Sequence, residues 1–484
     1  MPQDHDPTST PNEHPAPDGA IQPILDAPLR NVLTERRAAG RAARKRRPRS
    51  DFAGWAPAAH RPDPVAVLES QIPSRLQQLI PERHRRMLES AFAFYRGGAA
   101  IMAADLGALP NTGLEVQLCG DAHLANFGLF GSPERALVFD LNDFDETHPG
   151  PWEWDVVRLA VSALLLGRDR GWDDEVQHGL VVATVASYRT AMRSFAQMSN
   201  IDIWYSMMRV EQMASQVEDL RSRRRLERTV AKARANDTRR AVEKFTEVVG
   251  DRRFFRHQPP TMYRLDEFYG PSHRDQIKHQ IYQLFGAYVD SLSPELQHLA
   301  PMYQLRDEAL KVVGVGSVGT RCYVALARGR DENDLMILQI KEAQESVLAP
   351  YWTSPPMDNE GERVVNGQRL MQAASDPFLG FARIDPHDFY VRQFRDMKGS
   401  ADLTRIRRQA AGDYLRNCGW TLARAHARSG DSVAIASYLG STDRFDRAMV
   451  EFCRDYADQV QVDYEAFEAA ANSGRIEVAP TPAV

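Results

Sequence analysis

The sequence predicts an α+β fold in which helical segments flank one β-rich region. Three observations support this: helical apolar spacing between residues 73 and 106, an apolar segment from Trp152 to Gly167, and β-branched and aromatic runs between residues 309 and 343. Apolar residues three and four apart indicate a helix with one buried face, and short β-branched runs between turn residues indicate strands. With 484 residues and 43 % hydrophobic residues, the chain is long enough for two or three domains.

The first 50 residues are predicted to form an arm. Residues 1–30 are rich in Pro, Asp and Thr, which predicts disorder, and eight basic residues follow between Arg36 and Arg49. This basic segment is either an arm for nucleic acid or an anionic surface, or a helix laid across an acidic face of the same protein. Because the net charge is −5 and no aromatic residues interleave with the arginines, we favour the second interpretation and expect no nucleic-acid partner.

Composition also bears on the compartment. There is no apolar signal core at the N-terminus and no run of about 18 apolar residues, so we expect no membrane partner. The four cysteines, at positions 119, 322, 418 and 453, form no CxxC pair, which fits a reducing compartment. We expect a cytoplasmic protein, and the sequence leaves its oligomeric state open.

The first predicted helix covers residues 73–106, where Gly97 and Gly98 are expected to interrupt it. Arg96, directly before these glycines, could reach a phosphate, although an ordinary surface arginine is the simpler interpretation.

Two acidic loop tips come next, in the stretch 116–146, VQLCGDAHLANFGLFGSPERALVFDLNDFDE. One apolar run leads into Asp121 and, five residues later, Asn126; a second run leads into the carboxylates Asp140, Asp143, Asp145 and Glu146. Two short strands would deliver these side chains to the same end of a small sheet. Gathered carboxylates repel one another unless a cation lies among them, and hard oxygen ligands suit Mg²⁺. Ordinary turn chemistry is the alternative, since Asp and Asn are common in loops.

The same side chains fit the roles that a kinase-like phosphotransferase requires. Such enzymes need an Asp to orient or deprotonate the acceptor hydroxyl, an Asn for metal, and a later Asp that bridges metal to phosphates. Asp121, Asn126 and Asp143 occur in that order, with His123 as a further candidate catalytic residue in the first loop. Asp140 and Asp145 are alternative metal ligands.

These loops resemble a known superfamily. GDAHLAN resembles the GDxHxxN loop of aminoglycoside phosphotransferases and choline-kinase-like proteins, and NDFDETHPGPWEWD resembles their metal-Asp segment, with Asp155 twelve residues after Asp143. On this resemblance we prefer Asp143 to Asp140 as the metal ligand. Cys119 departs from the pattern, which usually carries His there; that position is mainly structural.

After the acidic loops, the chain is again predicted to be helical. The apolar segment from Trp152 to Gly167 is predicted to form a buried helix, and further helices are predicted to about Leu299. The arginine-rich segment 217–244 is either a surface for an anionic substrate or, as we favour, a solvated helix face.

Three strands are predicted between residues 309 and 343, with VVGVGSV and TRCYVALA as the first two. A Gly-Thr turn lies between them, and Gly314, Gly316 and Gly319 form a GxGxxG pattern that includes Ser317. A Rossmann interpretation requires a helix directly afterwards, whereas TRCYVALA is β-branched and aromatic. We favour a glycine-rich hairpin folded over phosphates; a plain tight hairpin is the alternative.

Lys341 ends the third strand, 22 residues after Gly319, where it could pair with α- and β-phosphates. A buried lysine requires a partner, and the helix predicted from Glu360 to Ala374 offers Glu360 or, as we prefer, Glu362. FLGFARI and DFYVRQF resemble the fourth and fifth strands and the hinge of a kinase small lobe, which implies that the backbone from Arg392 to Phe394, including Gln393, meets the adenine.

The order of these motifs predicts a kinase-like two-lobe fold that is circularly permuted. In ordinary kinases the glycine-rich loop and lysine precede the catalytic loop, and here they follow it. Chain termini that lie close together on a surface make such a permutation tolerable; a chance glycine-rich hairpin is the competing account. The expected domains are a basic arm, a helical large lobe, a small β lobe and closing helices, at residues 1–50, 51–304, 305–400 and 401–484.

From about residue 30 the chain also resembles a bacterial family known as domain of unknown function two-two-five-two, in stretches such as FAFYRGGAAIMAADL, QLCGDAHLANFG, VVGVGSVGTR and GWTLARAHARSGD. The resemblance implies a kinase-like relation and no established substrate. We expect ATP- and Mg²⁺-dependent phosphoryl transfer to a hydroxyl of an unknown small-molecule acceptor. Nucleotidyl transfer at the same site and nucleotide binding without transfer are the alternatives.

Overall fold

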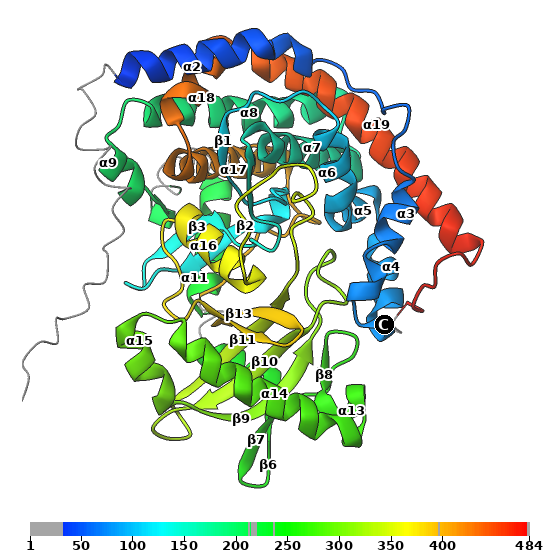
Figure 1. Ribbon diagram of the computed structural model, residues 1–484, viewed down its shortest axis with the longest axis vertical. Helices are drawn as coiled ribbons and strands as arrows, with labels where there is room; N and C mark the ends of the chain where they lie inside the picture. The colour runs from blue at the N-terminus through cyan, green and yellow to red at the C-terminus, as the bar shows by residue number, and fades with distance from the viewer. Residues whose placement is uncertain (1–31, 212, 214–219, 236–237, 395–396, 482–484) are drawn as a thin grey trace, which may run out of the picture.

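The protein combines a helical part with a part built on an antiparallel sheet (Figure 1). The computed structural model describes residues 32–211, 213, 220–235, 238–394 and 397–481. We call residues 238–394 the sheet part and the other described residues the helical part. The predicted α+β class is confirmed.

The sheet part is organised around six antiparallel strands in the order β12-β13-β11-β10-β9-β8. They are β8 (Met262–Arg264), β9 (Gln304–Lys311), β10 (Cys322–Arg328), β11 (Leu335–Ala343), β12 (Gly380–Ile384) and β13 (His387–Gln393). Along β10, Val324 and Leu326 join one buried cluster, whereas Tyr323 and Ala325 join another. Successive side chains of a strand point to opposite faces, so both faces of this sheet are apolar and need a cover.

Helices provide that cover. α14 (Pro271–Asp290) buries Ile281 and Leu284 in the cluster on one face, and α12 (Thr238–Phe245) buries Val242 in the cluster on the other. The remaining elements before β9 are the hairpin β6 (Thr246–Val249) and β7 (Arg252–Phe255), with the helices α13 (Leu265–Tyr269) and α15 (Pro294–Leu299). The expected domain boundary assigned all residues up to 304 to the large lobe, whereas α12 and α14 pack on the sheet.

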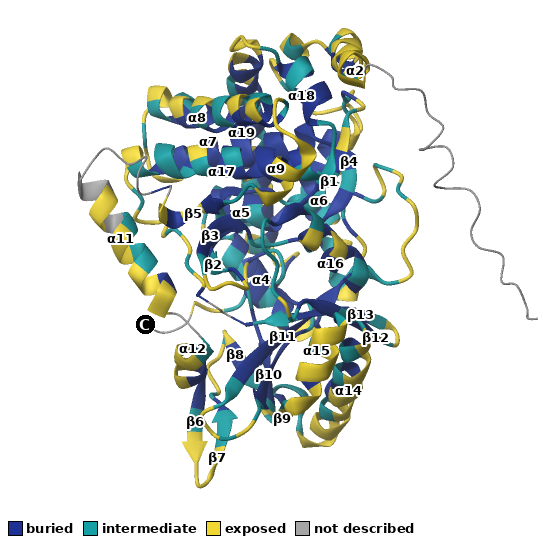
Figure 2. Cartoon of the chain, turned by 90° about the vertical axis from the view of Figure 1, so that its left-hand side faces the viewer, coloured by how far each residue is buried: buried dark blue, intermediate teal, exposed yellow. Residues whose placement is uncertain are grey.

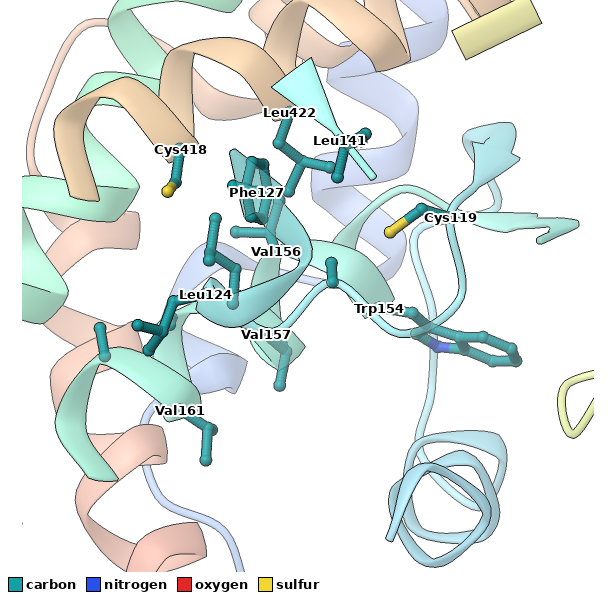
Figure 3. Packing of buried hydrophobic residues seen from close by; sticks show 14 of the residues in the cluster. Cys119, Leu124, Phe127, Leu141, Trp154, Val156, Val157, Val161, Cys418 and Leu422 are labelled. Atoms are coloured by element: carbon teal, nitrogen blue, oxygen red, sulfur yellow. The ribbon is translucent and has the colours of Figure 1, made fainter. Parts of the chain in front are cut away.

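The helical part is centred on α7 (Glu153–Asp169), which is buried along nearly its whole length. The helix predicted from Trp152 to Gly167 is therefore confirmed. Around it lie α8 (Asp174–Phe195), α17 (Arg408–Ser429) and α19 (Arg444–Asn472). Figure 3 shows Val156 of α7 near Phe127 and near Leu422 of α17, and all three belong to one buried cluster. The C-terminal helices thus return to helices formed before residue 200.

The helix predicted over residues 73–106 is divided into α4 (Ile80–Met87), α5 (Ala91–Gly97) and α6 (Ala99–Gly107). Ser90 caps α5 by accepting a hydrogen bond from the Ala93 N–H, and Gly98 separates α5 from α6. The predicted interruption at Gly97 and Gly98 is confirmed.

Two small sheets lie in the helical part. β1 (Glu115–Leu118) pairs with β4 (His148–Pro151), and β3 (Leu137–Leu141) lies between β2 (Phe127–Gly131) and β5 (Met208–Arg209). The remaining helices are α2 (Val32–Arg46), α3 (Pro64–Glu69), α9 (Asn200–Tyr205), α11 (Leu220–Ala235) and α18 (Ser432–Leu439). Figure 2 shows that α11 is mostly exposed or half-buried, in contrast to the buried strands of the sheet part. Parts of the arginine-rich segment 217–244 lie outside the described residues.

The basic helix α2 lies across α18. Arg36 forms an ion pair of 2.8 Å with Asp431, and Arg44 Nε donates to the Tyr438 carbonyl at 2.8 Å. Gly40 packs so closely on the Ala434 carbonyl that no Cβ would fit. Arg44 therefore donates to a carbonyl at the C-terminal end of α18, and Arg36 pairs with the carboxylate of Asp431 before its N-terminal end. The predicted disorder of residues 1–30 concerns residues outside the described range.

α16 (Glu360–Met371) joins the two parts, because it packs on β12 and β13 of the sheet and also on α17. It confirms the helix predicted from Glu360 to Ala374. No helix in the described ranges combines the length and apolar character that crossing a bilayer requires.

Candidate functional site

A cleft lies where three loops meet between the helical part and the sheet part. The loops follow β1, follow β3 and connect β9 to β10. The predicted site residues that line the cleft are Asp121, His123, Asn126, Asp143, Asp145, Gly314, Gly316 and Ser317. The structure thus brings together residues that are almost 200 positions apart.

Asp121 is carried by a tight loop after β1. Gly120 has φ +83°, and a Cβ there would overlap the backbone carbonyl of Glu146. Asp155, in the first turn of α7, accepts hydrogen bonds from the N–H groups of Cys119 at 2.8 Å and Gly120 at 3.1 Å. Asp155 therefore fixes the backbone on which Asp121 sits.

Asp155 is itself supported from the C-terminal helices. His426 of α17 places Nε2 3.2 Å from the Asp155 carboxylate and Nδ1 2.8 Å from the hydroxyl of Tyr188 on α8. All three side chains are buried. His426 of α17, and with it the C-terminal helices, thus contributes to the support of the Asp121 loop.

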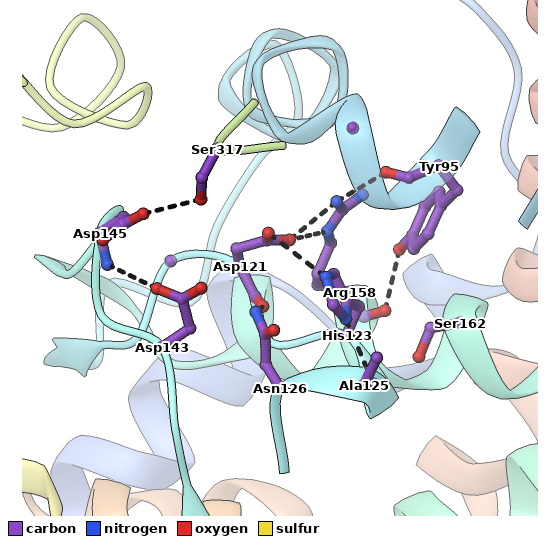
Figure 4. A network of polar contacts seen from close by, with 12 residues as sticks. Tyr95, Asp121, His123, Ala125, Asn126, Asp143, Asp145, Arg158, Ser162 and Ser317 are labelled. Carbon is purple, nitrogen blue, oxygen red and sulfur yellow. Dashed lines mark hydrogen bonds and ion pairs between the residues drawn. The ribbon is translucent and has the colours of Figure 1, made fainter. Parts of the chain in front are cut away.

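The carboxylate of Asp121 is paired with Arg158 of α7 (Figure 4). Arg158 Nε and Nη2 lie 2.9 and 2.8 Å from Oδ1, and Nη2 also donates to the Tyr95 carbonyl at 2.8 Å. The guanidinium lies 3.9 Å from the centre of the Tyr95 ring. Burial alone lowers the pKa of Arg158, but Tyr95 and Asp121 outweigh it and hold the pKa above its ordinary value. Arg158 is therefore a fixed positive charge that orients Asp121.

His123 is a neutral neighbour of Asp121. Its Nδ1 accepts the Ala125 N–H at 3.2 Å, which assigns the ring proton to Nε2, 3.5 Å from Asp121 Oδ2. Burial, and then the charges of Arg96 and Arg158, hold the pKa of His123 well below its usual range. His123 therefore orients the second carboxylate oxygen without adding a charge.

Asn126 and Asp143 are the donors best suited to a cation. The Asn126 amide donates to the Asp121 carbonyl at 2.8 Å, which leaves its side-chain oxygen for a metal ion. Burial and the neighbouring Asp145 raise the pKa of Asp143. No set of three His, Cys, Asp or Glu side chains in the described part of the chain is placed to hold a metal ion. Mg²⁺ commonly needs only one or two carboxylates, with phosphate oxygens and water completing its shell, so this pair fits it.

Asp145 binds the lysine of β11. Lys341 forms an ion pair with Asp145 and lies 3.9 Å from Asp143; Tyr390 donates to Asp145 at 2.8 Å and Ser317 donates at 3.1 Å. Burial raises the pKa of Asp145, but Lys341 and the hydrogen bonds from Lys341 and Tyr390 outweigh it, so the pKa lies below its usual value. The ammonium group is thus held beside the acidic loop.

Asp140 lies elsewhere. It is part of β3, is 1 % exposed, and pairs with the buried Arg424 of α17 while it accepts the Ala373 N–H at 2.9 Å. Strand alternation turns this side chain away from the loop that follows β3. Asp140, predicted as an alternative metal ligand, therefore lies outside the cleft in a structural ion pair.

The glycine-rich segment is a loop from residue 312 to 321, not the strand predicted for VVGVGSV. Positive φ angles of +67° at Gly314 and +94° at Gly319 end the strand geometry there. Arg75 donates to the carbonyls of Gly316 at 2.8 Å and Val318 at 2.7 Å, and Arg86 donates to that of Gly314 at 2.8 Å. Among the described residues no partner is recorded for the N–H groups of Gly314, Gly316 or Gly319, and such groups can bind phosphate oxygens.

Besides Asp140, the predicted site residues that do not line the cleft are Gly319, Lys341, Glu362 and Gln393, although Lys341 is paired with the cleft residue Asp145. Glu362 contributes no ion pair to Lys341; instead Arg363 of the same helix donates to the carbonyls of Asp145 at 2.9 Å and Gln344 at 2.6 Å. Gln393 gives its backbone N–H to Asp376 and its amide to Thr238. Residues 395–396, directly after the segment predicted to meet the adenine, lie outside the described residues.

The sequence interpretation missed Arg158, Tyr390 and Arg75. Arg158 alone had a local signal, because a charged residue within an otherwise apolar buried helix requires a partner. The others meet the cleft only through the fold.

A family model described as "Uncharacterized protein conserved in bacteria (DUF2252)" matches residues 75–470, a range that includes all three cleft loops. No curated protein and no solved structure matches the chain.

Proposed function

Since this chain belongs to that family conserved in bacteria, whose description names no reaction, we propose a function from the cleft. The protein is an ATP- and Mg²⁺-dependent phosphotransferase with a circularly permuted kinase-like fold. The observation that carries the proposal is the convergence of the glycine-rich loop and the two acidic loops in one cleft, where Asp145 pairs with Lys341.

The order of elements in the sheet part supports the fold. Protein kinases carry a glycine-rich loop before a strand that ends in the phosphate-binding lysine, and a helix follows. Here β9, the glycine-rich loop, β10, β11 with Lys341 and α16 follow in that order, and β12 and β13 come next. In this proposal the large lobe is formed by helices before residue 206 together with α17–α19.

Each residue has a role in transfer. Asn126 and Asp143 would hold Mg²⁺, which would neutralise phosphate charge, and Lys341 with the N–H groups of the glycine-rich loop would hold the phosphates. Asp121, oriented by Arg158 and His123, would accept the proton of the acceptor hydroxyl. The acceptor oxygen then forms a bond to the γ-phosphorus as the bond from that phosphorus to the bridging oxygen breaks, which leaves ADP.

Calorimetric titration with ATP and Mg²⁺ tests the proposal. Wild-type protein should bind, and Lys341→Met and Asp143→Asn should each weaken binding at least tenfold, about 1.4 kcal/mol or more. Lys244→Met and Asp458→Asn change exposed residues outside the cleft and should bind like wild type.

Asp121→Asn separates binding from transfer. It should keep MgATP binding within about threefold and lower phosphoryl transfer by about 10²–10⁴-fold, the usual contribution of a positioned base. Failure of folded wild-type protein to bind at millimolar MgATP would overturn the proposal.

A further inference from the structure

One arginine of the cleft, Arg96, forms no side-chain ion pair with another residue that the structure describes. Arg96, in the last turn of α5, lines the cleft with Asp121 and His123. Its Nε is enclosed without a hydrogen bond, and among the described residues no ion pair is recorded for its guanidinium. Burial lowers the pKa of Arg96, and the charge of Asp121 only partly opposes this effect. A half-buried cation in this state is costly unless a ligand supplies the opposite charge.

The neighbouring arginines differ in this respect. Arg158 is committed to Asp121, Arg75 donates to two carbonyls of the glycine-rich loop, and Arg86 pairs with Glu82 at 2.7 Å. Arg96 therefore stands out among the guanidinium groups around the cleft.

The position of Arg96 distinguishes the two ends of the cleft. Figure 4 shows Asp121 between Ser317, Asp143 and Asp145 on one side and Arg158 and Tyr95 on the other. Arg96 follows Tyr95 in α5 and is close enough to His123 for its charge to depress the pKa of that ring. Its side chain thus acts on the Arg158 side of Asp121, whereas its backbone lies against Gly316 of the glycine-rich loop.

We propose that Arg96 binds an anionic group of the acceptor, so that the substrates of this site are hydroxyl compounds that also carry a phosphate or a carboxylate. This inference rests on the proposed function, because it takes Asp121 as the group that receives the acceptor hydroxyl. A guanidinium presents parallel N–H donors that match both oxyanions. A neutral alcohol would leave Arg96 unpaired, which disfavours neutral acceptors.

Anion binding to the full chain tests the inference. The protein is first saturated with Mg²⁺ and β,γ-imido-ATP, which fills the γ-phosphate position and is not hydrolysed. Inorganic phosphate and malonate are then titrated separately, as probes for the phosphate and carboxylate sources. At least one should bind, and Arg96→Gln should weaken that binding tenfold or more. Arg96→Lys keeps the charge without the paired donors and should give an intermediate affinity.

The control is Arg168→Gln, which removes a half-exposed arginine that is paired with Asp458 outside the cleft. It should bind the anions like wild type. Thermal unfolding of each variant verifies that it is folded.

Three results would overturn the inference. Equal anion binding by wild type and Arg96→Gln would remove Arg96 from the site, and so would the absence of binding by both anions. Because Gly316 lies against the backbone of Arg96, a tenfold loss of imido-ATP affinity in Arg96→Gln would assign this guanidinium to the γ-phosphate instead. If wild-type protein binds no nucleotide, the proposed function fails separately, and titration of the nucleotide-free protein still reports whether Arg96 holds an anion.

Discussion

At the residue scale, Glu146 joins the two acidic loops to the segment that follows β11. Its carboxylate accepts the Val347 N–H at 2.8 Å, and its carbonyl accepts the Ser346 hydroxyl at 2.8 Å. Burial raises the pKa of Glu146 to about 7, although the Val347 hydrogen bond and Arg363 oppose the shift. The side chain therefore changes charge close to neutral pH.

The raised pKa sets a direction for stability. A carboxyl with a pKa of about 7 when folded and 4.5 when unfolded stabilises the fold fully below about pH 4.5. This contribution is lost as the pH rises through 7. Glu146→Gln cannot ionise, so its free energy of unfolding should rise relative to wild type by up to about 3 kcal/mol between pH 5 and pH 8.

Urea denaturation of wild type and Glu146→Gln at both pH values measures this difference. Glu89→Gln, which alters an exposed carboxylate on the surface, should show a constant difference from wild type. A constant difference for Glu146→Gln as well would mean that Glu146 stays ionised in the folded protein.

Individual site residues could be predicted from the sequence where the signal lay in the spacing of nearby residues. Asp121, Asn126 and Asp143 stood out through their spacing, and they meet in one cleft. Asp140 shares the composition of that segment, but its place inside β3 turns it toward Arg424. Arg96 looked like a surface residue because only the packing of α5 against the Asp121 loop encloses it.

At the element scale, the loop after β1 depends on a glycine. Gly120 combines φ +83° with direct contact to the Glu146 carbonyl. Gly120→Ala should therefore lower the free energy of unfolding by about 1–3 kcal/mol, the usual cost of a strained backbone position, and should weaken MgATP binding. Chemical denaturation measures the first effect and calorimetry the second.

The matched control is Gly179→Ala, because Gly179 lies within α8 and a Cβ there would meet nothing within 4 Å. Alanine should stabilise that helix by about 0.5–1 kcal/mol. If Gly120→Ala behaved like this control, the two acidic loops would not be held together as the structure has them.

Elements were predictable where periodicity is strong, as for α7 and β11. The division of residues 73–106 into three helices was only partly foreseen, because the Ser90 cap competes with an apolar pattern that continues through it. VVGVGSV has the composition of a strand, but two glycines with positive φ turn it into a loop.

At the scale of the whole molecule, α2 fastens the N-terminal end of the described chain to α18. Arg36 and Arg44 form three hydrogen bonds to α18 and its N-terminal Asp431. Removal of residues 1–46 also removes the hydrogen bond from Arg46 to the Thr112 carbonyl, so it should cost about 4 kcal/mol, at about 1 kcal/mol for each bond. Removal of residues 1–31 alone should leave the free energy of unfolding unchanged.

Denaturation of both truncated proteins measures these costs. If the basic segment served nucleic acid instead, removal of residues 1–46 would abolish a salt-dependent DNA affinity and leave stability untouched.

The arrangement of the two parts could be expected only in outline. The order of the motifs predicted closing helices that complete the large lobe, and in the structure α17 packs on α8. The partners of α12 and α14 could not be predicted, since an apolar helix face does not reveal which surface will cover it.

The return of α17 to α8 also has a consequence for synthesis of the chain. α8 ends at Phe195 and α17 begins at Arg408. At 5–20 residues per second, a ribosome needs roughly 10–40 s to cover that interval. During this time the apolar surface of α8 has left the ribosome without its partner, while the sheet can already form. Newly made protein thus passes through a stage in which the apolar face of α8 needs protection from aggregation.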